Sequence, residues 1–128
     1  SPSQVTDRAY WEGRANLETL PLADELLQLI NANASSLYQL NYNKQYIGLT
    51  DGLRTNNFVI MRPRKRHMRC NFYLRDGEIY RERLEEAGLS VDTGRKGQLI
   101  VNLSKQDLRQ HKELLREFVG VLVDEQES

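Results

Sequence analysis

The middle of the chain changes to a hydropathy period of two, and this constrains the fold more than any other feature. In the run "HMRCNFYL" at 67–74, every second side chain from Met68 to Leu74 is apolar. That alternation is typical of a strand with one buried face and one wet face. Asp51-Gly52 is a strong turn signal and Pro63 cannot donate to a strand ladder, so both mark breaks between strands. The predicted strands of this antiparallel meander are 37–43, 46–50, 57–63 and 67–74.

Helical spacing appears on both sides of the meander. The leucine-rich run after Pro21 has its proline in the first turn, where a missing N–H costs nothing. Ser104 and Asp107 form a capping-box pattern before the last apolar stripe. The predicted helices are 6–15, 20–33, 78–88 and 105–123, and one or two further strands are expected within 91–103, the surer of them at 98–103.

The third of these helices has a short apolar face and a clear stop. We expect Ile79, Leu84 and Ala87 to point inward. Gly88 stands at the position where a left-handed residue commonly ends a helix.

These elements predict an α+β fold of two layers. A mainly antiparallel sheet of five to six strands is covered on one face by helices, in the element order ααββββαββα. The chain of 128 residues has the length of one ordinary domain. We expect a linker at 1–6, a single domain at 7–124 and a frayed tail at 125–128.

Composition limits the classes of protein to consider. No apolar stretch approaches the ~20 residues that span a bilayer, and no signal peptide opens the chain. The single cysteine, Cys70, excludes an internal disulfide framework and suits a reducing cytoplasm. Its place in the alternating run favours a small buried hydrophobe over a nucleophile or metal ligand. We therefore expect a cytoplasmic protein with no membrane partner.

The net charge of zero hides an uneven distribution along the chain. Residues 1–37 carry a net charge of −3, and residues 76–128 carry −4. The segment 38–75 has one acid, Asp51, against eight bases, which gives +7. If these bases share a face, the field there is positive and attracts anionic partners.

The run "RPRKRHMR" at 62–69 supplies five of these bases. A hairpin between the third and fourth strands places its tip at 63–67. Such an array binds phosphate through charge and, for arginine, through a two-pronged hydrogen-bonding fork. A charged tip also protects a sheet from edge association, so a solvated face is the alternative. The predicted phosphate contacts are Lys44, Arg62, Arg64, Lys65, Arg66 and Arg69.

Aromatic residues are interleaved with these bases. Tyrosines beside arginines can stack on unpaired bases. Tyr42, Tyr46 and Tyr73 are candidates for the open face of the sheet, and Tyr46 and Tyr73 are the predicted stacking residues. A role as ordinary sheet residues is the alternative. Trp11, the only tryptophan, is interpreted as an anchor for a short helix, with a ligand platform as the alternative.

The sequence contains no recognisable catalytic pattern. The two histidines, His67 and His111, are far apart in the sequence, and the basic segment offers only Asp51 as a carboxylate. Metal hydrolases need clustered ligands. No phosphate loop, nucleophile elbow or dinucleotide fingerprint occurs. We expect no catalytic residue, no metal and no cofactor in this chain.

The stretch "YNKQYIGLTDGLRTNNFVIMRPRKRHMRCNFYL" at 42–74 resembles an uncharacterised C-terminal domain of bacterial proteins labelled "predicted transport protein". The resemblance extends over roughly 7–123. It is moderately specific as a whole and weak in its pieces. The Asn56-Asn57 loop and the heavier basic tip depart from the family pattern. The matching positions are Lys44, Tyr46, Ile47, Phe58, Arg62, Pro63 and Lys65.

The resemblance implies a molecular context and supplies no catalytic residues. In that family the domain follows one related to mismatch endonucleases, and similar domains accompany restriction and defence modules. It implies that the 128 residues are the end of a longer protein, with a nuclease-like domain in the same full-length chain as a possible partner.

Three functional hypotheses follow. The first is a non-catalytic nucleic-acid-binding accessory domain of a nuclease or defence-system protein, which contacts the backbone of DNA, the favoured ligand, or RNA. The second is a protein-interaction or dimerisation module without nucleic-acid binding, because oppositely charged segments could also pair between chains. The third is a pocket for a small ligand or modified base, lined by Trp11 and the strand tyrosines. The sequence leaves the oligomeric state open.

Overall fold

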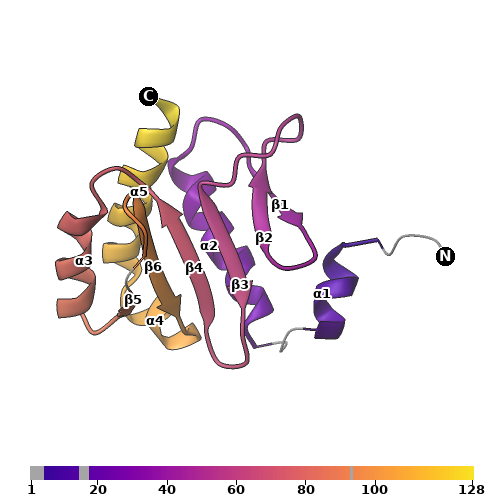
Figure 1. Ribbon diagram of the computed structural model, residues 1–128, viewed down its shortest axis with the longest axis horizontal. Helices are drawn as coiled ribbons and strands as arrows, with labels where there is room; N and C mark the ends of the chain where they lie inside the picture. The colour runs from indigo at the N-terminus through magenta and orange to yellow at the C-terminus, as the bar shows by residue number, and fades with distance from the viewer. Residues whose placement is uncertain (1–4, 15–17, 93) are drawn as a thin grey trace.

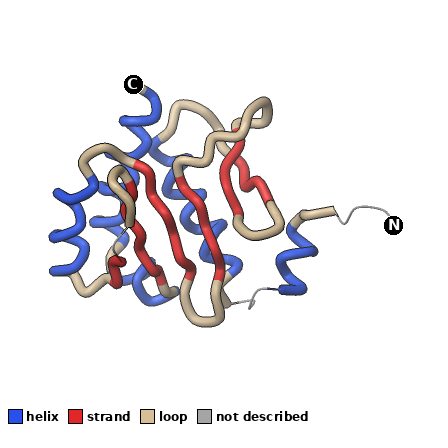
Figure 2. The backbone as a smooth tube through the Cα atoms, viewed as in Figure 1, coloured by secondary structure: helices blue, strands red, loops and turns tan. Residues whose placement is uncertain are grey.

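The computed structural model describes residues 5–14, 18–92 and 94–128, which form one sheet and the helices around it (Figures 1 and 2). The helices are α1 (Arg8–Arg14), α2 (Leu20–Asn33), α3 (Gly77–Glu86), α4 (Lys105–Gln110) and α5 (Lys112–Glu127). The strands are β1 (Gln39–Tyr42), β2 (Ile47–Thr50), β3 (Val59–Pro63), β4 (Met68–Tyr73), β5 (Ser90–Asp92) and β6 (Gln98–Leu103). This arrangement confirms the α+β fold class.

The sheet has six strands in the order β1-β2-β3-β4-β6-β5, and every neighbouring pair is antiparallel. The first four strands form the expected meander. Asp51 stabilises the turn between β2 and β3, since its Oδ1 accepts hydrogen bonds from the backbone N–H groups of Leu53 and Arg54, both at 2.8 Å. Gly52 adopts a φ of 96°, which confirms the turn predicted at Asp51-Gly52.

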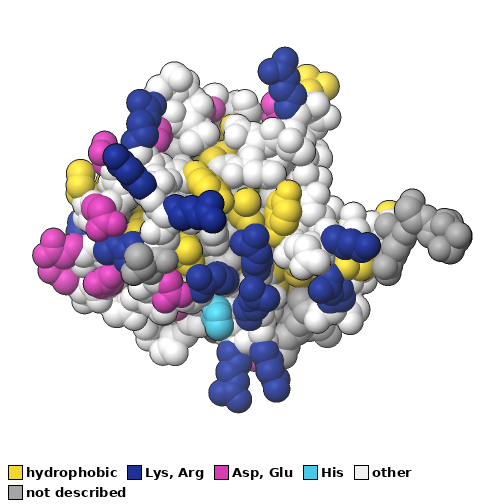
Figure 3. Space-filling model, viewed as in Figure 1, with side chains coloured by type: hydrophobic (Ala, Val, Ile, Leu, Met, Phe, Trp, Pro, Cys, Tyr) yellow, Lys and Arg dark blue, Asp and Glu magenta, His cyan; other side chains and the backbone are white. Residues whose placement is uncertain are grey.

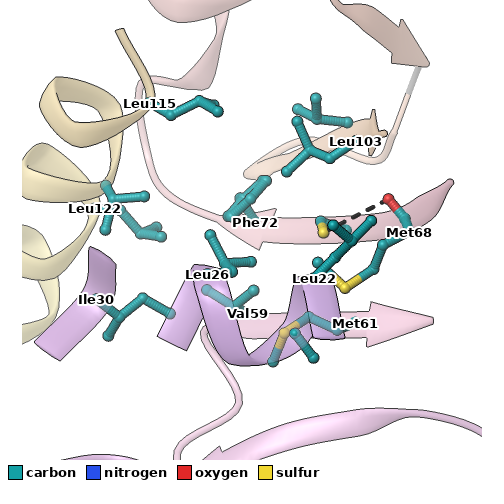
Figure 4. Close-up of a cluster of buried hydrophobic side chains, with 14 of the residues drawn as sticks. Leu22, Leu26, Ile30, Val59, Met61, Met68, Phe72, Leu103, Leu115 and Leu122 are labelled. Carbon is teal, nitrogen blue, oxygen red and sulfur yellow. Dashed lines mark hydrogen bonds between the residues drawn. The ribbon is translucent and has the colours of Figure 1, made fainter. Parts of the chain in front are cut away.

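The core lies between one face of the sheet and the helices behind it (Figures 1 and 4). In β4 the apolar side chains alternate with half-exposed ones, as the period of two predicts. From α2, Leu22, Leu26 and Ile30 meet this face and are almost fully buried. Phe118 of α5 packs edge-on against Phe72 of β4, with ring centroids 5.0 Å apart. The opposite face of β3, β4 and β6 carries the half-exposed side chains, together with Ile100 of β6, which is buried.

The inward face of α3 differs from the expectation. Ile79 is 67% exposed, whereas Tyr80 packs against the Phe118 ring at a centroid distance of 5.4 Å. Leu84 is fully buried, as expected. The inward face of α3 therefore starts at Tyr80, one residue after Ile79. The Tyr80 ring is long enough to reach Phe118 while part of it stays in solvent. Gly88 has a φ of 93°, which confirms it as the left-handed residue after the helix.

The single helix expected at 105–123 is two helices that meet at His111, whose φ of −119° and ψ of 35° interrupt the helical backbone. The capping box predicted at Ser104 and Asp107 is present. The tail expected to fray at 125–128 is helical to Glu127. Two side chains hold it: Glu125 accepts from the Arg75 backbone N–H at 2.9 Å, and Glu127 accepts from Ser35.

Gly48 lies where two segments approach closely, and this gives a prediction for stability. Asn57 Oδ1 accepts a hydrogen bond from the Leu49 backbone N–H at 3.1 Å, and a Cβ on Gly48 would overlap that oxygen. We expect Gly48→Ala to displace Asn57 and lower the free energy of unfolding by about 1–3 kcal/mol, as other overpacked sites do. Urea denaturation measures the change.

A matched control is Gly13→Ala in α1, where an added Cβ meets no atom within 4 Å among the described residues. Because alanine favours a helix over glycine, this variant should be as stable as the wild type or slightly more stable. A Gly48→Ala variant with wild-type stability would contradict the steric argument.

Candidate nucleic-acid interface

The β3–β4 hairpin presents a short basic tip. Pro63 pairs with Met68 in the ladder, and the Arg64 backbone N–H donates to the His67 carbonyl at 2.8 Å, which closes a tip of four residues. The side chains of Arg64, Lys65 and Arg66 are exposed on this tip. Pro63, which we expected at the tip, is instead buried at the end of β3.

The meander brings a second basic turn to the same end of the sheet. Because β1 to β4 alternate in direction, the β1–β2 turn with Lys44 and the β3–β4 tip both lie at one end. Tyr46 lies two residues after Lys44, and the Arg62 guanidinium carbon lies 5.8 Å from the Tyr46 ring centroid, a cation–π contact. In Figure 3, Lys and Arg side chains gather over the β3–β4 hairpin, whereas acidic side chains gather towards α3.

Two bases of the segment 38–75 lie elsewhere. Arg54 belongs to the connection between β2 and β3, and Arg75 follows β4, so both are at the opposite end of the sheet. The Arg75 side chain pairs with Glu125 at 3.4 Å. The six predicted phosphate contacts therefore fall on the hairpin and on the turn beside it, and the other two bases do not.

Arg69 differs from the other predicted contacts in its surroundings. It projects from β4 onto the open face, where its Nη1 lies 2.6 Å from Asp92 Oδ2 and 3.4 Å from Asn102 Oδ1. Its charge is therefore largely balanced within the protein. Lys44, Arg62, Arg64, Lys65 and Arg66 have no ion-pair partner within the described part of the chain.

The tyrosines divide between the two faces of the sheet. Tyr46 and Tyr73 are half-buried, and the Tyr73 hydroxyl accepts a hydrogen bond from Gln98 Nε2 at 2.8 Å. The expectation that Tyr42 faces the open side is wrong. Tyr42 is paired with the buried Ile47 and packs against the core, and its hydroxyl accepts a hydrogen bond from Arg8 at 3.1 Å.

Helix α1 lies against the β1–β2 turn and is held there by specific contacts. Trp11 is 5% exposed, and its indole Nε1–H donates to the Asn43 carbonyl at 2.8 Å, which is the anchor geometry expected from the sequence. The Arg8 guanidinium forms two hydrogen bonds with Asp24, at 2.7 and 3.0 Å, and these raise the pKa of Arg8. Helix α1 is thereby tied to both α2 and the sheet.

Arg14 is a basic residue near the interface that is not among the predicted phosphate contacts. It lies in the last turn of α1, and its Nη1 donates to the Lys44 carbonyl at 2.6 Å and to the Tyr10 hydroxyl. It thus lies next to the basic turn, although 30 residues separate the two in sequence. The only sequence signal was the Trp11 anchor three residues earlier.

Metal-ligand clusters and the cysteine thiol are two further kinds of group that can carry chemistry. No cluster of three or more His, Cys, Asp or Glu side chains that could hold a metal occurs among residues 5–14, 18–92 and 94–128. Cys70 is fully buried, and burial raises the pKa of its thiol, so the thiolate is disfavoured. The arrangement at the hairpin offers charge and hydrogen-bond donors for an anion.

No family model, no curated protein and no solved structure matches this chain. Among the described residues, no helix has the length and apolar character needed to cross a bilayer.

The ion pair on the open face gives a prediction for pH dependence. Hydrogen bonds from Asn102 and Arg69 lower the pKa of Asp92. A carboxylate with a lowered folded pKa stabilises the protein above its unfolded pKa, and this stabilisation is lost as the pH falls through the folded pKa. We expect Asp92→Asn to lower the free energy of unfolding at neutral pH, with a deficit that disappears in acid.

Urea denaturation of the wild type and Asp92→Asn at a series of pH values measures this deficit. Asn102 remains able to hydrogen-bond the new amide, so the change isolates the charge. A deficit of equal size at neutral and acid pH would contradict the assignment of the stabilising charge to Asp92.

Proposed function

We propose that this chain is a non-catalytic module that binds a nucleic-acid backbone, with DNA as the favoured ligand, through the end of the sheet that carries the β3–β4 tip. One observation carries the proposal. Lys44, Arg62, Arg64, Lys65 and Arg66 lie at one end of the sheet and have no carboxylate partner in the described part of the chain.

The physical basis of this binding is the high density of negative charge on a nucleic-acid backbone. Lysine and arginine that neutralise phosphates release condensed counterions, so affinity falls steeply with salt and depends little on base sequence. Arg62 over the Tyr46 ring adds a planar surface on which an unpaired base could stack. Arg69 contributes less, because Asp92 already balances its charge.

The resemblance described above adds context. We propose that in the full-length protein this module presents a nuclease-like domain to its substrate. We also propose a cytoplasmic location, since the one cysteine is a buried free thiol.

Fluorescence anisotropy tests the binding proposal. A labelled 20-base-pair DNA duplex, its single strand and the RNA single strand of the same sequence are titrated with the protein at about 50 mM salt. We expect saturable binding that weakens steeply by about 200 mM salt. Tighter binding of RNA than of DNA would change the assigned ligand, and no saturable binding to any of the three would remove the proposal.

A second candidate, a protein-interaction module, is favoured by two exposed leucines. Leu37, before β1, is 71% exposed, and Leu53, in the β2–β3 connection, is 94% exposed. Both lie at the end of the sheet opposite the basic tip. Size-exclusion chromatography with light scattering decides between the candidates: a stable dimer that binds no nucleic acid supports this second one.

A further inference from the structure

A small hollow lies between the end of α1 and the β3–β4 hairpin, with a volume of about 170 Å³. We call it the arginine hollow, because three of the residues that line it are arginines. Arg14 comes from α1, which Trp11 anchors to the β1–β2 turn, and Arg62 and Arg64 come from the β3–β4 hairpin. The lining residues are Trp11, Arg14, Gln45, Arg62, Pro63 and Arg64.

Arg14 is oriented at this hollow by uncharged groups, and it has no carboxylate partner among the described residues. Its Nη1 donates to the Lys44 carbonyl and the Tyr10 hydroxyl, which are neutral acceptors. Its guanidinium carbon also lies 5.8 Å from the Trp11 ring centroid, a second neutral contact. A guanidinium has five N–H donors, and the Arg14 donors on Nε and Nη2 have no hydrogen-bond acceptor in the described part of the chain, so they can bind an anion.

The hairpin supplies the other side of the hollow. Arg62 is held over the Tyr46 ring, and Pro63 fixes the backbone that follows it. Arg64 is exposed, but its backbone is fixed by the hydrogen bond to His67 that closes the tip. The Gln45 side chain adds an amide that can donate a hydrogen bond.

We infer that the arginine hollow binds one phosphate group of the nucleic-acid chain. This inference rests on the proposed function and adds a discrete site to it. A hollow of about 170 Å³ has room for several water molecules, and therefore for a phosphate group of five heavy atoms. Arginine forks match pairs of phosphate oxygens, and three positive charges suit either an internal diester or a terminal monoester.

The test uses a variant that places a negative charge in the arginine hollow and leaves the Trp11 anchor of α1 unchanged. Gln45 is exposed in the β1–β2 turn, so Gln45→Glu should fold normally while its carboxylate pairs with the arginines and repels phosphate. Gln28→Glu is the matched control, because Gln28 is exposed on α2, a helix packed on the other face of the sheet.

Two-dimensional NMR of the ¹⁵N-labelled protein detects phosphate binding in the arginine hollow directly. Trp11 is the only tryptophan, so its indole N–H gives a single resonance at the edge of the site. In a titration with inorganic phosphate at constant ionic strength, we expect saturable shifts of this resonance and of the Gln45 and Arg64 amides. Gln45→Glu should weaken the apparent affinity at least tenfold, and Gln28→Glu should leave it unchanged.

Short thymidine oligonucleotides with a 5′-phosphate, a 3′-phosphate or neither then distinguish the sources of the group. Equal shifts with all three assign an internal phosphodiester, and larger shifts with one phosphorylated form assign that end of the strand. Shifts no different from those with chloride, or equally strong in Gln45→Glu, would overturn the inference. The anisotropy assay is independent of this result, because DNA binding without phosphate-specific shifts would retain the proposed function and remove only the hollow.

Discussion

Replacement of Arg64, Lys65 and Arg66 together by alanine is expected to lower the affinity for a DNA duplex by on the order of 10²-fold at 0.1 M salt. The binding constant scales with salt to a power proportional to the number of phosphates neutralised. Removal of three contacts should therefore reduce the slope of log K against log salt by about three units. Because these side chains are exposed and have no carboxylate partner in the described chain, stability should not change.

The chain offers a matched control for this variant. Arg54, Arg95 and Lys96 are also two arginines and one lysine, and all are exposed in turns at the opposite end of the sheet. Their replacement by alanine changes the net charge by the same amount. If both triple variants lose affinity equally, the binding reflects overall charge, and the β3–β4 tip has no special role.

The second large effect concerns the core. Phe118 is fully buried and contacts Phe72 of the sheet and Tyr80 of α3, so it joins three elements. We expect Phe118→Ala to lower the free energy of unfolding by about 3–5 kcal/mol, a large fraction of the total for a domain of this size. Urea denaturation followed by circular dichroism measures the loss.

Val121→Ala on the same helix is the control, since Val121 is 38% exposed and alanine favours the helix. This variant should stay within about 0.5 kcal/mol of the wild type. A similar, small loss in both variants would mean that Phe118 does not link the sheet to the helices.

The sheet was predictable because its signals are local. The alternation from Met68 to Leu74 identifies which side chains are buried, and Gly52 identifies the turn that separates two strands. The placement of the basic tip followed from the same reasoning, since a hairpin with Pro63 at its end leaves the next bases at the tip. These predictions depend only on residues that are close together in the sequence.

The remainder depends on contacts between distant residues. The ion pair between Arg69 and Asp92 could not be predicted from residues near Arg69 in the sequence. It forms only because β5 lies at the edge of the sheet. Arg14 joins the interface because α1 folds back onto the β1–β2 turn. Tyr80 faces the core in place of Ile79 because it contacts Phe118, which lies on another helix.

Mapping the footprint of a DNA duplex on the ¹⁵N-labelled protein tests whether one end of the sheet is the contact surface. We expect amide shifts concentrated at 43–46 and 62–67, with small changes at 51–54 and 94–97. Shifts that map to the helical face, or to both ends of the sheet equally, would contradict it.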